Sequence, residues 1–416
     1  MLILKIAFRN IFRQKRRTVL TALSMFGGFV LAAFFIGFSD GTYNDIINTF
    51  TRNQMGHIQV HHKDYLDRPS LYKTIDGLPQ IEKILFETRE VESWAPRLYS
   101  AGLASVGEKS AGVRIIGIDP AREIQTTRIN EKITKGTMFH DNGDGNSNEN
   151  GASHEVIIGK GLAKLLKADL GDEAVIVSQG ADGSIANDAY KIVGILDSGD
   201  EIGDRMAFYL PMRAAQELLV MEGRVHELAI TVSSLDDVAW TNELLAEKAA
   251  AVEPDLVVDP WQVFARSFYV AMKADKEGMW VMLVIIILVV AVGVLNTVLM
   301  SVLERQREYG VLKAVGTKPG QIIKMVLTEV SILAVICVIL GTAVGLFLNY
   351  LVSVQGFSLP EPISYGGMDF QHMRTEINAR SFYIPTVTVI LAAMLVSIFP
   401  ALKAAHTDPA KSMRIH

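Results

Sequence analysis

The sequence predicts an α-helical membrane protein with four transmembrane helices and a large α+β domain inserted between the first and the second helix. Four segments are free of Asp, Glu, Lys and Arg over at least 21 residues, long enough at 1.5 Å per residue to cross a hydrocarbon core of about 30 Å. The predicted spans are residues 18–38, 279–303, 325–352 (uncharged from 330) and 381–402. One precedes the polar-rich residues 39–278 and three follow them, which predicts a one-plus-three topology around a water-facing domain.

The distribution of charge predicts the orientation. Residues 1–17, 304–324 and 403–416 together carry 14 Lys and Arg residues but 3 Asp and Glu residues. Short loops rich in Lys and Arg stay in the cytoplasm. We therefore expect a multi-pass membrane protein with both termini and the 304–324 segment in the cytoplasm. The domain at 39–278 and the loop at 353–380 are then expected on the outer side of the membrane.

The first span is interpreted as an uncleaved anchor. Its basic flank is typical of a signal peptide, but the apolar stretch is too long and no A-x-A-like cleavage site closes it. The single cysteine, Cys337, lies in the third span, so the inserted domain has no disulfide. That domain must rely on its own apolar core, as is common in bacterial envelope proteins.

Ahead of the first span, residues 1–17 mix apolar and basic positions. Phe8 and Phe12 share one face of a helix, whereas Arg9 and Arg13 lie on another. This pattern predicts an amphipathic helix that lies in the inner headgroup layer. The alternative is an ordinary basic flank of a span.

The inserted domain mixes strand-like and helix-like periodicity, which predicts an α+β domain. Strands are expected at residues 57–61, 113–118, 155–158, 174–178, 191–196, 206–210 and 226–232. Helices are expected at residues 80–86, 161–166, 213–219 and 238–251. Helical spacing of apolar residues over 40–51 and 260–279 predicts that the first two spans continue into the domain as stalk helices.

The segment at 304–324 is more elaborate than a connection between two spans requires. We expect a charged helix end, an amphipathic turn and a loop, with Val311, Leu312 and Val315 forming an apolar docking face. A solvated basic loop is the alternative. The candidate docking residues are Glu304, Arg305, Arg307, Glu308, Gly310, Val311, Leu312, Val315 and Gly316.

A family resemblance begins in this segment, residues 304–322, ERQREYGVLKAVGTKPGQI. It resembles the cytoplasmic signature of FtsX-type permeases, the membrane subunits of ABC transporters in the MacB, LolC/LolE and FtsX group. The lead-in AFRNIFRQKRRT (7–18) and the ending PALKAAHTDPA (400–410) are similar to those of the family. Within the inserted domain, the motifs IGIDP (116–120), EVIIGK (155–160), VGIL (193–196) and LP (210–211) resemble the MacB-type periplasmic core.

The resemblance covers nearly the whole chain and implies a location and partners. It implies a protein of the bacterial inner membrane with the domain at 39–278 and the loop at 353–380 in the periplasm. In the family, the segment that matches 304–324 contacts a separate cytosolic ABC ATPase. The permease pairs with itself or with a homologous permease. Membrane lipids and a periplasmic partner or lipoprotein are further expected contacts, and no nucleic acid is expected.

No ATP site is predicted in this chain. Residues 102–110, GLASVGEKS, nearly match a phosphate-binding loop, but Glu108 separates the second glycine from the lysine. We therefore expect a non-catalytic subunit without a cofactor of its own, while the partner ATPase binds ATP and Mg²⁺.

No metal site is predicted either. Residues 144–155 have oxygen ligands at the spacing of a calcium loop, but Glu149 stands where the sharp turn needs glycine, so we expect a solvated loop. His57, His61 and His62 lack a neighbouring carboxylate or cysteine to complete a site, and structural or surface roles are expected for them.

Small and polar residues in the spans predict close helix packing. Gly341 and Gly345 allow two helices to approach, within one chain or between two copies. Asn296 and Asn349 are expected to form hydrogen bonds between helices. No charged residue lies in a span centre, which argues against ion-coupled transport through the bilayer.

The resemblance implies a permease that converts ATP hydrolysis by the ATPase into conformational work in the periplasm, the mechanotransmission of type VII ABC transporters. The expected work is extraction or export of a lipoprotein or another amphiphile. The lipid is expected to enter between the first two spans, near Phe34, Phe35, Phe38 and Trp280, although these residues also fit an interfacial aromatic belt. Two alternatives stay open: MacB-like efflux of peptides or drugs with partner proteins, and an FtsX-like regulator of a periplasmic enzyme.

Overall fold

The computed structural model describes residues 7, 9, 15–139, 154–365 and 368–407. Most of the predicted amphipathic helix, all but two residues of the calcium-like loop and most of the tail at 403–416 lie outside the described residues. The chain divides into two compact units. The first comprises residues 1–45, 273–360 and 372–416, and the second comprises residues 46–272 and 361–371.

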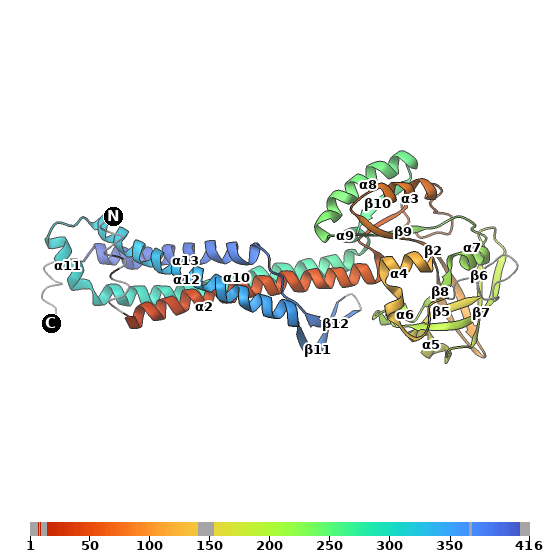
Figure 1. Cartoon of the computed structure of the whole chain (residues 1–416), viewed down its shortest axis with the longest axis horizontal. Coiled ribbons are helices and arrows are strands. Elements are labelled where there is room, and N and C mark those ends of the chain that lie inside the picture. The colour runs from red at the N-terminus through yellow and green to blue at the C-terminus, as the bar shows by residue number, and fades with distance from the viewer. Residues whose placement is uncertain (1–6, 8, 10–14, 140–153, 366–367, 408–416) are drawn as a thin grey trace. The chain divides into compact units, whose positions relative to one another are not determined.

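The first unit is a bundle of long helices. It contains α2 (Lys15–Phe50, up to residue 45), α10 (Arg266–Glu304, from residue 273), α12 (Pro319–Gln355) and α13 (Arg380–Ala405). Each is long and apolar enough to cross a membrane, and the four predicted spans lie within them. Between α10 and α12 the chain forms the short helix α11 (Gln306–Ala314) (Figure 1).

The core of this bundle takes side chains from every helix. Buried members include Met25 and Phe29 of α2, Val294 of α10, Ala334 of α12 and Ala393 of α13. Because membrane lipid is as apolar as these side chains, close packing and hydrogen bonds hold such a bundle together.

The two asparagines in the spans differ in their surroundings. Asn349 Nδ2 donates to the carbonyl oxygen of Ala33 at 3.4 Å, which confirms its predicted bond between helices. Asn296 is exposed on α10, so the same prediction is wrong for it within the described part of the chain.

The second unit is built on a ten-stranded sheet with the order β10-β1-β9-β2-β3-β8-β5-β7-β4, and β6 pairs with β2 and β7. Pairs β3–β8 and β5–β7 are parallel, and the other pairs are antiparallel. The strands are β1 (Ile58–His62), β2 (Val91–Val106), β3 (Lys109–Ile118), β4 (Ile133–Gly136), β5 (Glu155–Gly159), β6 (Glu173–Gln179), β7 (Ile185–Leu196), β8 (Ala207–Pro211), β9 (Glu227–Val232) and β10 (Leu256–Pro260).

Among the described residues, this sheet is accompanied by the end of α2, the start of α10 and the helices α3 (Leu78–Glu87), α4 (Pro120–Thr127), α5 (Lys160–Leu166), α6 (Glu201–Asp204), α7 (Met212–Leu219), α8 (Val238–Val252) and α9 (Trp261–Phe264). The largest apolar core in this unit packs Leu162 of α5 and Leu219 of α7 against Ile158 of β5 and Phe208 of β8. These four side chains are fully buried. The domain therefore has the disulfide-free core that its size permits.

The seven predicted strands and four predicted helices of this domain are present, with shifts of a few residues at their ends. The sequence did not predict β2, β4, β10 or α4, and the predicted loop at 353–380 contains two further paired strands, β11 (Phe357–Tyr365) and β12 (Met368–Met373). The predicted stalk at 260–279 is wrong as one helix. Residue Ala265, at φ −104° and ψ 43°, separates α9 from α10.

Candidate functional site

A buried arginine fixes the start of α11 against α12. Arg305 follows α10 directly and is 7% exposed. Its Nε donates to Glu308 Oε2 at 2.9 Å, and its Nη1 donates to Glu329 Oε2 of α12 at 3.1 Å. The guanidinium lies 5.4 Å from the ring centre of Tyr309. Paired and hydrogen-bonded in this way, the buried charge holds two helices in one register.

A second anchor lies at the other end of α11. The Lys313 ammonium donates to the carbonyl oxygens of Ala405 and Thr407, at 3.0 and 2.9 Å, where α13 ends. An ammonium at a helix C-terminus satisfies carbonyls that lack partners in the helix and complements the helix dipole. Tyr309 and Leu312 also pack against the bundle core, and burial raises the pKa of Tyr309 to about 12. One side of α11 is therefore tied to α12 and α13.

The other side of α11 is exposed and partly apolar. Arg307, Val311, Ala314 and Val315 recur at helical spacing and are all exposed. The exposed fractions of Val311 and Val315 are 50% and 83%. Gly316 follows at φ +99°, a conformation that favours glycine and turns the chain toward α12. We call Arg307, Val311 and Ala314, together with Val315 directly after the helix, the outer face of α11.

The structure thus separates the nine predicted docking residues into two groups. Arg305, Glu308, Gly310 and Leu312 lie toward the bundle, and the expected apolar face of Val311, Leu312 and Val315 is wrong for Leu312. The exposed residues are Glu304, Arg307, Val311, Val315 and Gly316. On a helix, residues 307, 311 and 315 lie on one face, whereas residues 305, 309 and 312 lie on another. Predicting a helix over residues 306–314 would therefore have separated these exposed residues from these inward ones.

Gly341 and Gly345 of α12 pack against α2 of the same chain. A Cβ added at Gly341 would lie 2.5 Å from Cδ1 of Phe29, and one at Gly345 would lie 3.5 Å from Cβ of Ala33. The close helix contact expected at these glycines is therefore made within one chain in this structure. Gly341 is the position where no side chain fits.

Replacing Gly341 by Ala is expected to lower the thermal unfolding midpoint of the full chain in lipid nanodiscs. The added methyl forces the Phe29 ring from its packed position, a change that costs about 1–3 kcal/mol. Gly27→Ala is the matched control, because a Cβ at Gly27 of α2 meets nothing within 4 Å. Equal midpoints for the two variants would contradict the packing described here.

The aromatic residues predicted to mark lipid entry do not form one site. The rings of Phe34 and Phe38 stack at a centroid distance of 6.0 Å. Trp280 is 45% exposed and contacts Arg380 at the start of α13, 6.0 Å from its ring centre. Among the described residues, no ring contact joins Trp280 to these phenylalanines or to Phe35.

Within one chain, side chains fill part of the space between the first two spans. Ala32 and Ile36 of α2 are buried in a cluster with Leu283 of α10, and Gly28 lies so close to Val290 that no Cβ would fit. Along these residues α2 and α10 of a single chain are in contact, whereas a cavity lined by Thr21 and Ser301, among others, lies between the two helices nearer residue 18.

The three histidines of the β1 region do not assemble a metal site. The described residues contain no cluster of three His, Cys, Asp or Glu side chains that could hold a metal ion. His57 is buried, and its Nδ1 accepts from the amide of Val232 at 3.0 Å. His61 Nε2 lies 3.2 Å from Asp259 Oδ2. In the described part of the chain, these two histidines have structural contacts.

The burial of His57 predicts a pH dependence of stability. Burial and the nearby Arg52 lower the pKa of His57 to about 4, whereas an unfolded histidine titrates near 6.5. The folded state therefore favours the neutral ring. The stability that this preference contributes is complete above pH 6.5 and decreases as the pH falls from 6.5 to about 4. Over that window we expect a loss of about 3 kcal/mol. The His57→Asn variant should show a shallower fall of the unfolding midpoint between pH 7 and 4.5, and an unchanged slope would contradict the assignment.

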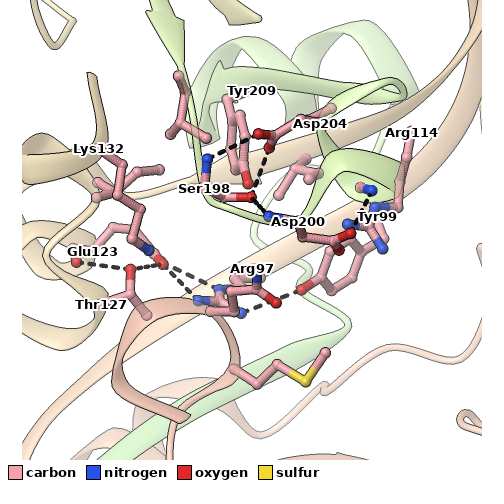
Figure 2. A pocket seen from close by; sticks show the side chains of 17 residues that line it. Arg97, Tyr99, Arg114, Glu123, Thr127, Lys132, Ser198, Asp200, Asp204 and Tyr209 are labelled. Carbon is pink, nitrogen blue, oxygen red and sulfur yellow. Dashed lines mark hydrogen bonds and ion pairs between the residues drawn. The ribbon is translucent and has the colours of Figure 1, made fainter. Parts of the chain in front are cut away.

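The inserted domain also contains a polar cavity that the sequence did not predict, drawn in Figure 2. At one wall Arg97 of β2 donates to Glu123 Oε1 of α4 at 2.6 Å and to Glu227 Oε1 of β9 at 3.3 Å. Thr127 donates to the same Glu123 oxygen at 2.6 Å. Burial raises the pKa of Glu227, while Arg97 opposes that shift. The buried charges on this wall are thus paired with one another.

Further residues of the cavity come from distant parts of the chain. Arg114 of β3 lies over Tyr99, its guanidinium 6.0 Å from the ring centre. Lys132, Asp200 and Tyr209 also line the cavity, whose volume is about 90 Å³. A sheet that joins β2, β3 and β8 brings these residues together, and no local sequence pattern marks them.

Two family models match this chain. The MacB-like periplasmic core domain matches residues 18–248, more than half of the chain, and the FtsX-like permease C-terminal domain matches residues 280–409. Together they cover both units of the structure.

Curated relatives match most of this chain. The chain is 22% identical to the lipoprotein-releasing system transmembrane protein LolC of Neisseria meningitidis over 75% of either chain. It is 23% identical to the macrolide export ATP-binding/permease protein MacB 2 of Aeromonas hydrophila over 98% of this chain and 60% of that protein. Among solved structures, the periplasmic region of MacB from Actinobacillus actinomycetemcomitans aligns with a TM-score of 0.38 and 14% identity, over 51% of this chain and 93% of that one.

The family matches confirm the resemblance carried by the motifs at 304–322 and in the inserted domain. The relatives are permease components of ABC transporters. The chain therefore belongs to the FtsX-like permeases, inner-membrane proteins of the LolC, MacB and FtsX type that work with an ABC ATPase.

Proposed function

We propose that the outer face of α11 is the docking surface for a separate cytosolic ATPase, and that the chain transmits ATP-driven movement to its inserted domain. The observation that supports this most is the two-sided character of α11. Arg307, Val311 and Val315 are exposed on one side, while Arg305 and Lys313 tie the opposite side to α12 and α13. A docking helix needs both an accessible apolar face and a rigid connection to what it moves.

The anchors define the proposed route of force. A push on α11 reaches α12 through the Arg305–Glu329 pair, which is about 3 Å long and largely buried. It reaches the end of α13 through Lys313. Because α2 and α10 pack in the same apolar core as α12, movement of α12 displaces them as well.

The proposed orientation places α11 and both termini in the cytoplasm and the inserted domain in the periplasm. The excess of Lys and Arg in residues 1–17, 304–324 and 403–416 supports it. A separate ATPase is supported by the LolC relatives, which are named as transmembrane proteins of a lipoprotein-releasing system and match about three quarters of both chains. The sequence of this chain also lacks a complete phosphate-loop motif.

The proposed substrate is a lipoprotein or a related amphiphile, and the proposed assembly is a dimer of this chain or a pair with a homologous permease. Relatives named as LolC proteins support the substrate, because they match about three quarters of both chains at 22% identity in Neisseria meningitidis and in Xylella fastidiosa. Efflux of a small molecule or peptide is the second candidate. The nearly complete coverage of this chain by a MacB relative supports it.

Reconstitution separates these functions. The chain and its ATPase are placed in proteoliposomes with a fluorescent acylated lipoprotein, and transfer to a soluble acceptor is measured with ATP and with a non-hydrolysable analogue. Lipoprotein release that requires hydrolysis is expected. Accumulation of a macrolide without lipoprotein transfer would favour efflux. Absence of both activities, with a periplasmic hydrolase co-purifying, would support a regulator and contradict transport.

A further inference from the structure

The second unit contains a larger cavity next to the polar one. Its volume is about 610 Å³, within the 300–1,000 Å³ that is common for small-molecule sites. Met55, Tyr99 and Arg114 line both cavities, so the two adjoin along one wall. All of their lining residues belong to the inserted domain.

The larger cavity has an apolar and aromatic part and a polar part. Tyr65, Leu66 and Leu71, from the segment after β1, line it together with Phe264 of α9, and Gln59, Ser178, Gln179 and Glu227 contribute polar groups. Tyr65 is nearly buried, and its ring stacks on that of His226 at 5.3 Å. A surface of this kind stabilises an aliphatic chain by removing its apolar area from water.

Two cations of the polar cavity, Arg114 and Lys132, form no side-chain hydrogen bond or ion pair within the described residues, although Glu123 and Asp204 lie near enough to Lys132 to act on its charge. The acids around this cavity are engaged by other groups. Burial lowers the pKa of Lys132 to about 8, which still leaves it mostly charged at neutral pH. The nearby carboxylates are each occupied: Glu123 and Glu227 by Arg97, Asp200 by the amides of Ile202 and Gly203, and Asp204 by Ser198.

We propose that these two cavities form one binding site for a single-chain anionic amphiphile. The carboxylate or phosphate head lies in the polar cavity between Arg114 and Lys132, and the aliphatic tail lies in the larger cavity. A guanidinium at the junction suits this arrangement, because it binds either anion with charge-assisted hydrogen bonds.

The position of the site links its occupancy to the membrane helices. Met55 is the last residue of the π-helical turn that continues α2, and Phe264 is the last residue of α9, just before α10 begins. Both side chains line the larger cavity. A tail bound there contacts the two segments through which the first and second spans enter the domain. This inference goes beyond the docking of an ATPase and does not depend on it.

Photolabelling of the full chain in lipid nanodiscs tests the site. The probe is dodecanoate with a diazirine near the end of its tail, and labelled peptides are identified by mass spectrometry. We expect labels on residues 65–71 and on the peptide that contains Phe264. Unlabelled dodecanoate and dodecyl phosphate are tested separately as competitors, and the stronger one identifies the preferred head. Dodecyltrimethylammonium, which has the same tail and the opposite charge, should not compete.

Variants at Arg114 provide the controls. Arg114→Gln should reduce specific labelling at least about tenfold, since one charge-assisted hydrogen bond contributes about 1.5–3 kcal/mol. Arg114→Lys should retain most of it. Arg213→Gln, at an exposed arginine outside both cavities, should leave labelling unchanged.

Labelling spread over the spans, equal competition by the cationic amphiphile, or equal labelling of Arg114→Gln and Arg213→Gln would overturn the proposal. Because neither ATP nor the ATPase is present, these results do not depend on the proposed docking face.

Discussion

Replacing both Val311 and Val315 by Asp is expected to weaken association with the partner ATPase by roughly 100-fold or more. The two side chains are 50% and 83% exposed, so the variant should fold normally. If they are buried in the complex, however, each carboxylate loses its water without gaining a partner. The affinity of the purified permease in nanodiscs for the ATPase, measured by biolayer interferometry, is the readout.

The matched control places the same change on exposed apolar residues of the inserted domain. Ile185 and Ile202 are 81% and 72% exposed. The double variant Ile185→Asp/Ile202→Asp should bind the ATPase with the affinity of the natural chain. Equal losses for the two double variants, or no loss for the α11 variant, would contradict docking at the outer face of α11.

Replacing Arg305 by Gln is expected to destabilise the bundle by about 3 kcal/mol and to uncouple ATP hydrolysis from release. The substitution leaves Glu329 largely buried without its cation, and loss of one partner of a buried pair costs about 3–5 kcal/mol. We place the value at the lower end because Glu329 keeps about a fifth of its side chain exposed. The thermal unfolding midpoint in nanodiscs and the ratio of lipoprotein released to ATP hydrolysed are measured together.

A compensating variant separates stability from coupling. Arg305→Met combined with Glu329→Leu replaces the pair with apolar side chains and should recover most of the midpoint, as such replacements often do. If the release ratio stays low in this stable variant, the ion pair itself matters for transmission. Lys135→Gln is the control, because both partners of its ion pair with Asp169 are exposed, so the midpoint should hardly change. A midpoint for Arg305→Gln equal to that of Lys135→Gln would contradict the anchor.

The fold could be predicted where the signal is local. The spans follow from uninterrupted apolar composition, and β5, β7 and β9 follow from runs of β-branched residues. The strand β2 has no such signal, since Pro96, Gly102 and several polar residues interrupt its alternation. Its place between β9 and β3 comes from tertiary pairing, which a sequence window does not contain. The sequence also gives no signal for the break at Ala265, because alanine at that position does not disfavour a helix.

The candidate sites show the same limit. The segment at 304–324 was predicted as the docking region from its charge and its family signature, but its inward residues were not distinguished from its outward ones. Arg305 and Glu329 are 24 residues apart, and only the fold makes them a buried pair. Arg114 of β3 and Lys132, which directly precedes β4, line one cavity although 18 residues separate them in the sequence. No spacing rule predicts such a pair.

One measurement tests the central claim most directly. A photo-crosslinking amino acid is placed at position 315 of the full chain, which is co-expressed with its ATPase, and the complex is irradiated and analysed by mass spectrometry. We expect a cross-link to the ATPase from position 315 and none from position 202 in the inserted domain. A complex that forms, hydrolyses ATP and releases substrate normally, yet gives no cross-link from position 315, would contradict the account of α11 as the docking element.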